Sequence, residues 1–124
     1  MRKRVSALAC ALFLVLTLAG GALASTQFIT IVTGSTGGTY YPVGTILANH
    51  FNTALMEKGC KWSAQSSGGT VENLDMIKSG EAEMAIVMAN ITGFAYTGTL
   101  QYEGKKIDNI RYMMGLWPDV TQFI

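Results

Sequence analysis

Two glycine-rich turns, each set between a strand-like run and a helix-like run, constrain this chain more than any other feature. The first turn covers residues 33–42 and follows a β-branched and aromatic run at residues 28–32. The second covers residues 65–72 and follows a shorter strand-like run at residues 61–65. β-branched and aromatic residues bounded by glycine are typical of strands. Each turn therefore predicts a strand that leads directly into a helix.

The segments that follow the two turns have the apolar spacing of helices. Residues 41–56 place apolar side chains three and four positions apart, and Pro42 suits a first helical turn. Gly59 is expected just beyond the end of this helix. A second helix is predicted at residues 70–79. It is expected to bury three apolar side chains, Val71, Leu74 and Ile77.

The remaining segments continue the alternation of strands and helices. Residues 85–88 form a continuous apolar run, as expected for a central strand buried on both faces. A short helix is predicted at residues 91–96 and a fourth strand at residues 110–117. The order βαβαβαβ predicts an α/β fold with a parallel-rich sheet and helices on both of its faces. Ligands of such sheets bind beyond the carboxyl ends of the strands, where both turns lie.

The first 24 residues have the pattern of a secretory signal peptide. Basic residues 2–4 precede a long uncharged apolar stretch, and residues 22–24 (Ala-Leu-Ala) form a small-x-small cleavage signal. A membrane anchor is the alternative, but a Gly-Gly pair and the cleavage signal favour removal after Ala24. Residues 25–124 would then be the exported part. Because residues 120–124 alternate like a strand in progress, we expect this part to belong to a longer protein whose other half is missing here.

Charge and cysteine content narrow the possible functions of residues 25–124. Three of the nine Lys and Arg residues lie in the leader, so six basic residues remain against eight acidic ones, a net charge of −2. A chain with this net negative charge lacks the excess of basic residues that is typical of nucleic-acid-binding proteins. Cys60 is alone after cleavage, so a buried thiol is favoured over an intermolecular bridge. No His/Cys cluster has metal-ligand spacing, and His50 lacks a nucleophile motif, so it is interpreted as an ordinary helix residue.

Both glycine-rich turns have the features with which proteins hold small anions. Each offers backbone N–H groups, small hydroxyls and a helix start, so neither a metal nor an arginine is needed. Glycine could instead serve only to turn the chain, but two similar turns at equivalent strand ends favour an anion site. Neither turn has the pattern of a nucleotide-binding loop, and no cofactor is expected. Two alternatives stay open: an exported enzyme that uses the turns as an oxyanion or phosphate cradle, and a surface adhesin without a small ligand.

Four stretches of the exported part carry a specific combination of motifs, at residues 31–44, 66–74, 80–87 and 96–98. In these stretches the chain resembles the TAXI family, the extracytoplasmic solute receptors of TRAP transporters. The resemblance implies a type II periplasmic-binding-protein fold, with a ligand held between two α/β lobes. It also implies a periplasmic protein, not an enzyme, that captures a small organic acid or amino acid, such as glutamate or a dicarboxylate. The loaded receptor would deliver that ligand to a TRAP membrane permease.

The expected ligand-binding residues come from the two turns and from the segment after the third strand. They are Thr36, Gly37, Gly38, Thr39, Tyr40, Ser66, Ser67, Gly68 and Asn90. The N–H groups of Gly37, Gly38 and Thr39 are expected to meet one carboxylate at the start of the first helix. One of the two adjacent tyrosines, Tyr40, is expected to form a wall of the site. Asn90 is expected to hydrogen-bond a polar group of the ligand.

Overall fold

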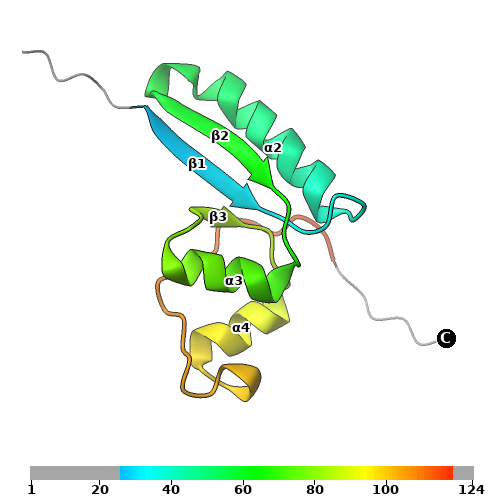
Figure 1. Ribbon diagram of the computed structural model, residues 1–124, viewed down its shortest axis with the longest axis vertical. Coiled ribbons are helices and arrows are strands. Elements are labelled where there is room, and N and C mark those ends of the chain that lie inside the picture. Colours follow the sequence, from blue (N-terminus) through cyan, green and yellow to red (C-terminus); the bar gives the residue numbers. More distant parts are fainter. Residues whose placement is uncertain (1–25, 119–124) are drawn as a thin grey trace, which may run out of the picture.

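Strands and helices alternate along the described part of the chain, which confirms the α/β fold class (Figure 1). The computed structural model describes residues 26–118; the expected leader at 1–24 and the strand-like residues 120–124 lie outside them. The elements, in order, are β1 (Gln27–Val32), α2 (Tyr40–Ala54), the 3₁₀ turn η1 (Met56–Lys58), β2 (Cys60–Gln65), α3 (Thr70–Ser79), β3 (Met84–Ala85), α4 (Ala89–Thr97) and the 3₁₀ turn η2 (Leu100–Tyr102).

The three described strands form one open, parallel sheet in the order β2-β1-β3. β1 pairs along its whole length with β2 but pairs with β3 only through Ile31 and Val32. Within residues 26–118, β1 lies in the middle of the sheet and the two-residue β3 lies at its edge, so the predicted central place of residues 85–88 is not seen among the described strands. Successive residues of this run enter different cores, as expected for burial on both faces. Ile86 packs in the core beneath α2, whereas Val87 packs in the core around α3 and α4.

The first core lies between α2 and one face of the sheet. Alternate residues of β2 face α2 and are half-buried. Among them, Trp62 packs against Phe51 of α2, with 4.7 Å between the ring centroids. Ile31 and Ala48 are buried at the centre. α2 approaches β1 closely because Gly44 has no side chain, and a Cβ atom there would collide with Cγ2 of Thr33. This contact holds the start of α2 against the end of β1.

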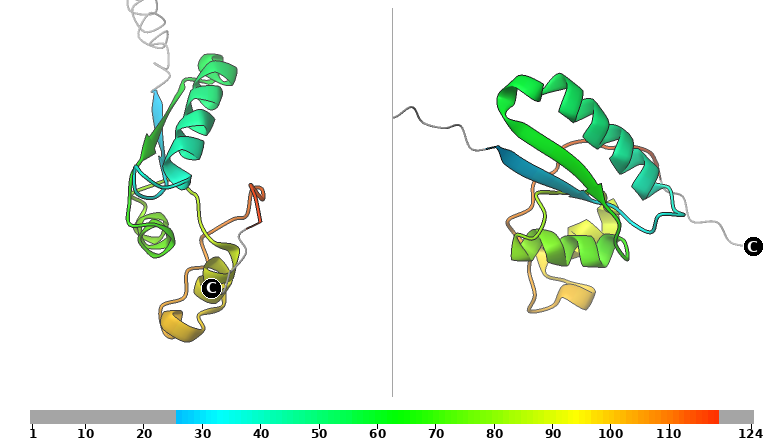
Figure 2. Two further views of the ribbon diagram at one scale, coloured as in Figure 1. Left: turned by 90° about the vertical axis from the view of Figure 1, so that its right-hand side faces the viewer. Right: turned by 45° about the horizontal axis from the view of Figure 1, so that its top comes forward.

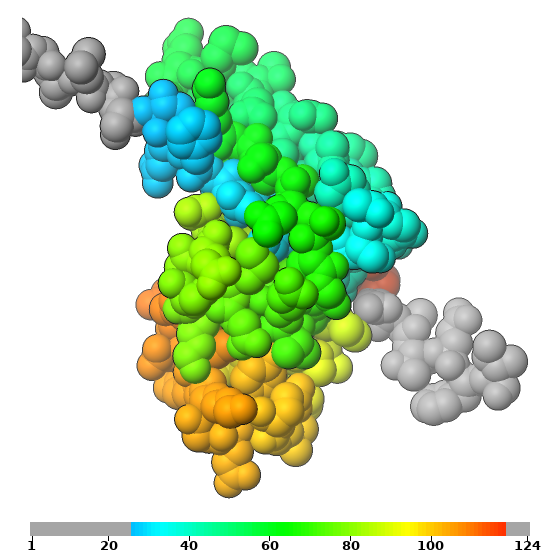
Figure 3. Space-filling model, viewed as in Figure 1, coloured from blue at the N-terminus to red at the C-terminus, as the bar shows by residue number. Residues whose placement is uncertain are grey.

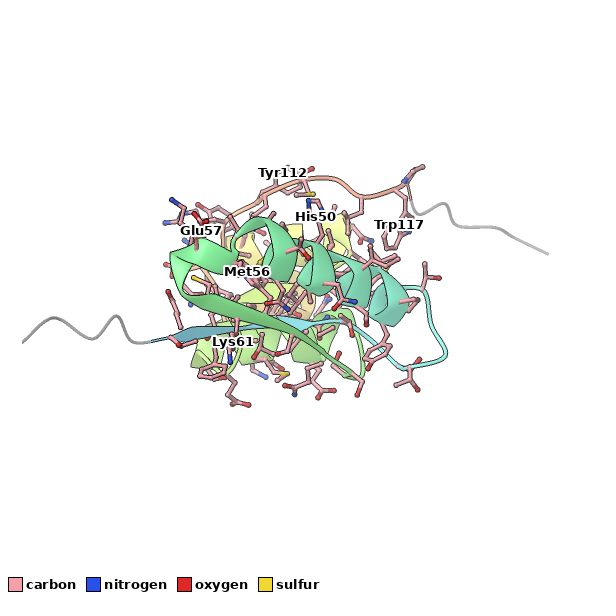
Figure 4. All side chains as sticks on the ribbon, turned by 90° about the horizontal axis from the view of Figure 1, so that it is seen from above. His50, Met56, Glu57, Lys61, Tyr112 and Trp117 are labelled. Carbon is pink, nitrogen blue, oxygen red and sulfur yellow. The ribbon has the colours of Figure 1, made fainter. Side chains whose placement is uncertain are left out.

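Within residues 26–118, the opposite face of the sheet is exposed along β2 and at the start of β1, whereas Val32 at the end of β1 is buried. Phe28 is 68% exposed, and Lys61 and Ser63 are exposed as well. Atoms of β1 (blue) and β2 (green) reach the surface in Figure 3. Lys61 points away from α2 in Figure 4. The side-chain alternation of a strand with one covered face explains this pattern.

The second core lies under α3 and α4, beside β3. It buries one residue of each of four successive segments, namely Leu74, Ala95, Tyr102 and Ile107. A backbone hydrogen bond of 2.9 Å from Ile107 N to Ala95 O attaches the chain after η2 to α4. The two cores adjoin at Ile86 and Val87, directly after β3, and they place α2, α3 and α4 relative to one sheet.

The fourth strand predicted at residues 110–117 is absent: this segment has no regular structure. Ile110 packs against the second core, but residues 111–117 are exposed. They pass beside α2 (Figures 2 and 4). There the ring of Trp117 meets that of Tyr40 edge-on, with 5.7 Å between centroids. A β-type run becomes a strand only where a neighbour offers backbone partners, and within the described residues β3 extends for only two.

The helices agree closely with the sequence predictions. α3 has the predicted bounds, and Gly80 ends it in the left-handed region. Gly59 has the same conformation but follows η1, whereas α2 already ends at Ala54, so its predicted place directly after that helix is wrong. Cys60 is a free thiol but is only half-buried, so it is more open than expected. Among residues 26–118, no helix combines the length and the apolar character that a membrane crossing requires.

Candidate functional site

The two glycine-rich turns lie side by side beyond the carboxyl ends of β1 and β2. The Ser67 N–H donates to the Gly34 carbonyl across 3.1 Å, which joins the turns directly. The backbone N–H and the hydroxyl of Thr33 both donate to the Gln65 carbonyl, at 3.0 and 2.7 Å. The predicted meeting of the two turns at one sheet edge follows from the parallel pairing of their strands.

The start of α4 joins the same region. The Met88 N–H donates to the Thr70 hydroxyl at 3.1 Å, which ties the beginning of α4 to the beginning of α3. Figure 1 shows the starts of α2, α3 and α4 on one side of the molecule. Asn90 lies in the first turn of α4 and is exposed there. Three helix N-termini, each with a partial positive charge, thus gather around the strand ends.

The first turn presents backbone donors to solvent. Residues 35–39 are exposed, and Thr36 is among them. The Gly38 N–H closes the turn on the Ser35 carbonyl at 2.9 Å, so this predicted donor is engaged internally. Within residues 26–118, the N–H groups of Thr39, Tyr40 and Tyr41 have no protein acceptor. The positive end of α2 is therefore open to an anion.

The second turn uses most of its donors internally. The Gly68 N–H donates to the Glu72 carboxylate at 2.7 Å, and the Gly69 N–H donates to the Ser67 hydroxyl at 3.0 Å. Gly69 precedes α3 with a φ of +101°, a conformation that favours glycine. Ser66 is exposed beside this network. Of the predicted ligand groups in this turn, Ser66 is thus the one without an internal partner among the described residues.

Asn73 is the residue of this region that sequence reasoning missed. Its side chain is fully buried. Its amide nitrogen donates to the carbonyls of Thr33 at 2.6 Å and Ile86 at 2.8 Å, and its oxygen accepts from the Ser67 hydroxyl at 2.5 Å. Val71, predicted for the inner face of α3, is instead 53% exposed. Helical spacing alone could have revealed Asn73, because it shares a face with the half-buried Ile77.

Other chemistry is sparse in the described part of the chain. No group of His, Cys, Asp and Glu within residues 26–118 is arranged to hold a metal ion. Arg111 donates to the carbonyls of Asp108 and Ile110, at 3.0 and 2.7 Å, within its own segment. An open hollow of about 280 Å³ includes Cys60, the first residue of β2, so it lies at the end of the sheet opposite the turns. Backbone dipoles are therefore the means of anion binding that the turns offer.

A comparison with protein families agrees with this geometry. Residues 31–124 match the model of the NMT1-like family, a range that includes both turns and the start of α4. This is a family of the periplasmic solute-binding type, whose members bind small molecules, work with a transporter and are typically extracytoplasmic. The match covers most of the 124 residues, so the chain belongs to the NMT1-like family.

Proposed function

We propose that this chain is the ligand-binding part of a TRAP-type solute receptor that captures a small organic acid or amino acid. The observation that carries the proposal is the 3.1 Å hydrogen bond from Ser67 N to Gly34 O, which sets two glycine-rich turns against each other. Membership of the NMT1-like family supports the capture of a solute for a transporter. The TRAP permease as partner rests on the resemblance of the turn motifs to the TAXI family.

A ligand carboxylate binds at the start of α2. It accepts hydrogen bonds from the N–H groups of Thr39, Tyr40 and Tyr41, which lack acceptors within residues 26–118. Gly37 supplies a further N–H, and Gly38 keeps the turn closed through its bond to Ser35. Several N–H groups and the helix dipole then act on one negative group, an arrangement that recurs at phosphate and carboxylate sites.

The remaining predicted residues surround that carboxylate. The exposed hydroxyls of Thr36 and Ser66 donate hydrogen bonds to the ligand, and Asn90 reads a polar group at the start of α4. Tyr40 forms a wall of the site, and its ring contacts that of Trp117 edge-on. Ser67 and Gly68 act indirectly, because their polar groups already bond Asn73 and Glu72. The resulting half-site is completed by a second lobe of the same protein, which closes over the ligand.

Export and binding without catalysis belong to the same proposal. Residues 1–24 direct export and are removed, and residues 25–124 form part of the first lobe. The site favours binding over turnover, because the Ser67 hydroxyl donates to the Asn73 amide and not to a histidine. A nucleophilic serine needs a base within hydrogen-bond reach.

Isothermal titration of the full-length mature receptor tests this function. L-Glutamate, succinate and 2-oxoglutarate are the probes, and at least one is expected to bind with a Kd of about 1 μM or tighter, near −8 kcal/mol. Glutaramide and succinamide, neutral analogues of similar shape, are the controls and should bind at least about 100-fold more weakly if N–H dipoles grip a carboxylate. Absence of binding by all three acids would overturn the proposal, as would turnover of a phosphate ester that is lost on Ser66→Ala.

A further inference from the structure

A continuous chain of hydrogen bonds runs through the buried Asn73 side chain. It begins in the second turn, where the Gly69 N–H donates to the Ser67 hydroxyl at 3.0 Å. That hydroxyl donates to the Asn73 oxygen at 2.5 Å. The Asn73 nitrogen then donates to the carbonyls of Thr33 and Ile86, just beyond β1 and β3, at 2.6 and 2.8 Å. One side chain thus joins the second turn to the ends of two strands.

Only an amide of this size satisfies all of these groups. The carbonyls of Thr33 and Ile86 need donors, whereas the Ser67 hydroxyl needs an acceptor. An asparagine has two N–H donors and one carbonyl oxygen, so it fits this demand. Leucine, although similar in volume, would leave buried polar groups without partners, and an ionised aspartate would set an oxygen against two carbonyl oxygens.

The position of Asn73 relates it to the proposed ligand site. Thr33 immediately precedes Gly34, whose carbonyl accepts from the Ser67 N–H at 3.1 Å. Asn73 therefore contacts the base of the first turn through Thr33 and the second turn through Ser67. Its side chain is 0% exposed, so it does not contact a ligand itself.

We propose that Asn73 is the positioning residue of the half-site, which fixes the second turn against the first before a ligand binds. This inference rests on the proposed function, because it assigns a role within that site. A site whose donors are already in place loses less conformational freedom on binding, which raises affinity without a new contact. Asn73 therefore controls how rigidly the two turns are held in the ligand-free protein.

Amide hydrogen exchange of the ligand-free, full-length protein tests the positioning role. Ser67→Ala removes the link between Asn73 and the second turn but leaves the bonds of Asn73 to Thr33 and Ile86 in place. We expect the Ser67 amide, whose acceptor Gly34 O is untouched by the substitution, to exchange at least about tenfold faster, while sheet amides such as that of Ile31 keep their protection. Ser79→Ala, the same change at the far end of α3, is the control and should alter none of them. Unchanged protection of the Ser67 amide in Ser67→Ala, or equally faster exchange throughout the sheet, would overturn the proposal.

Asn73→Asp tests the same role from the side of the amide. It retains the shape of the side chain but loses both donors, so the hydrogen-bonded amides of Thr33, Ser67 and Gly69 should exchange at least about tenfold faster than in the wild type. Asp75→Asn, an exposed position on the same helix, is the control. A folded Asn73→Asp protein with fully protected turns would contradict the proposal, and if this variant does not fold, Ser67→Ala decides.

Ligand affinity separates this inference from the proposed function. With L-glutamate and succinate as probes, Ser67→Ala should weaken the affinity of whichever probe binds the wild type by about tenfold, whereas Ser79→Ala should not. An unchanged affinity in Ser67→Ala would refute the positioning role while the proposed function stands. If the wild type binds neither probe nor any other small acid, the proposed function fails, and the exchange experiment still decides whether Asn73 orders the turns.

Discussion

At the scale of single residues, Glu72 has a clear electrostatic role in the second turn. It lies in the first turn of α3 and accepts from the Gly68 N–H at 2.7 Å. This is a variant of a capping box. Glu72, the third residue of α3, bonds the N–H of Gly68, which lies one residue before the N-cap Gly69. The negative charge also interacts favourably with the positive end of the helix.

Glu72→Gln is expected to lower the free energy of unfolding by about 0.3–1 kcal/mol at low salt, because the amide keeps an acceptor but loses the charge. Urea denaturation at low and high salt checks this. The difference from wild type should shrink at high salt, since screening weakens exposed charges. Glu57→Gln, on η1, is the control for loss of one negative charge. A difference that does not depend on salt would contradict the electrostatic account.

Tyr102 predicts a dependence of stability on alkaline pH. Its hydroxyl is buried without a partner among the described residues, and burial, together with the nearby Asp75 carboxylate, raises the pKa of Tyr102 above its usual 10.0. A raised pKa in the folded state means that the unfolded chain loses this proton first. The tyrosine therefore contributes no pH-dependent penalty below about pH 10 and destabilises the fold increasingly above it.

Tyr102→Phe should consequently reduce the fall in unfolding free energy between about pH 9.5 and pH 11. At pH 7 the variant should match the wild type to within about 0.5 kcal/mol, because no hydrogen bond is lost. Denaturation at a series of pH values measures both effects. An identical alkaline slope for the two proteins would show that the Tyr102 hydroxyl does not titrate differently on folding.

At the scale of elements, local patterns predicted what local interactions determine. The spacing of apolar residues located α3, and the glycines at its two ends explain why it starts and stops there. β1 and β2 were predicted within a residue or two. The errors concern strands whose existence depends on a neighbour. Residues 110–117 have β-type residues but no partner strand among the described residues, and within those residues β3 pairs with β1 only through Ile31 and Val32.

The close contact between α2 and β1 gives a prediction for that pair of elements. Gly44→Ala places a Cβ atom against Cγ2 of Thr33, so either α2 or the Thr33 side chain must shift. We expect a loss of about 1–3 kcal/mol in unfolding free energy, as for other overpacked cores. Gly93→Ala is the matched control, because a Cβ atom at this position of α4 meets nothing within 4 Å. That variant should gain about 0.5–1 kcal/mol from helix propensity. Urea denaturation of both proteins measures the contrast, and equal effects would contradict the packing account.

At the scale of the whole molecule, the sequence predicted where the candidate site lies better than how it is built. Strands that lead into glycine-rich turns placed both turns at one sheet edge, and their direct hydrogen bond confirms that they meet. The sequence did not predict that donors of the second turn are bonded within the protein. Their acceptors are the side chains of Asn73 and Glu72, which reach back from α3 to Ser67 and Gly68. Glycine and serine in a turn do not reveal whether their donors face a ligand or the protein. The first turn thus becomes the main anion-binding element of the proposed site.

The central claim is that the first turn holds a negatively charged group of the ligand. Gly37 allows a direct test, because a Cβ atom there meets nothing within 4 Å and the residue does not have a positive φ. Gly37→Asp adds a negative charge at the turn, and Gly37→Asn adds a neutral side chain of the same shape. The Kd of the full-length receptor for the acid that binds the wild type most tightly should therefore differ between the two variants.

Titration of both variants with that acid is the decisive measurement. The account predicts that Gly37→Asp binds at least about tenfold more weakly than Gly37→Asn, a difference of about 1.4 kcal/mol from like-charge repulsion. It also predicts that added salt narrows the gap. Equal affinities in the two variants would contradict the placement of the carboxylate at the first turn.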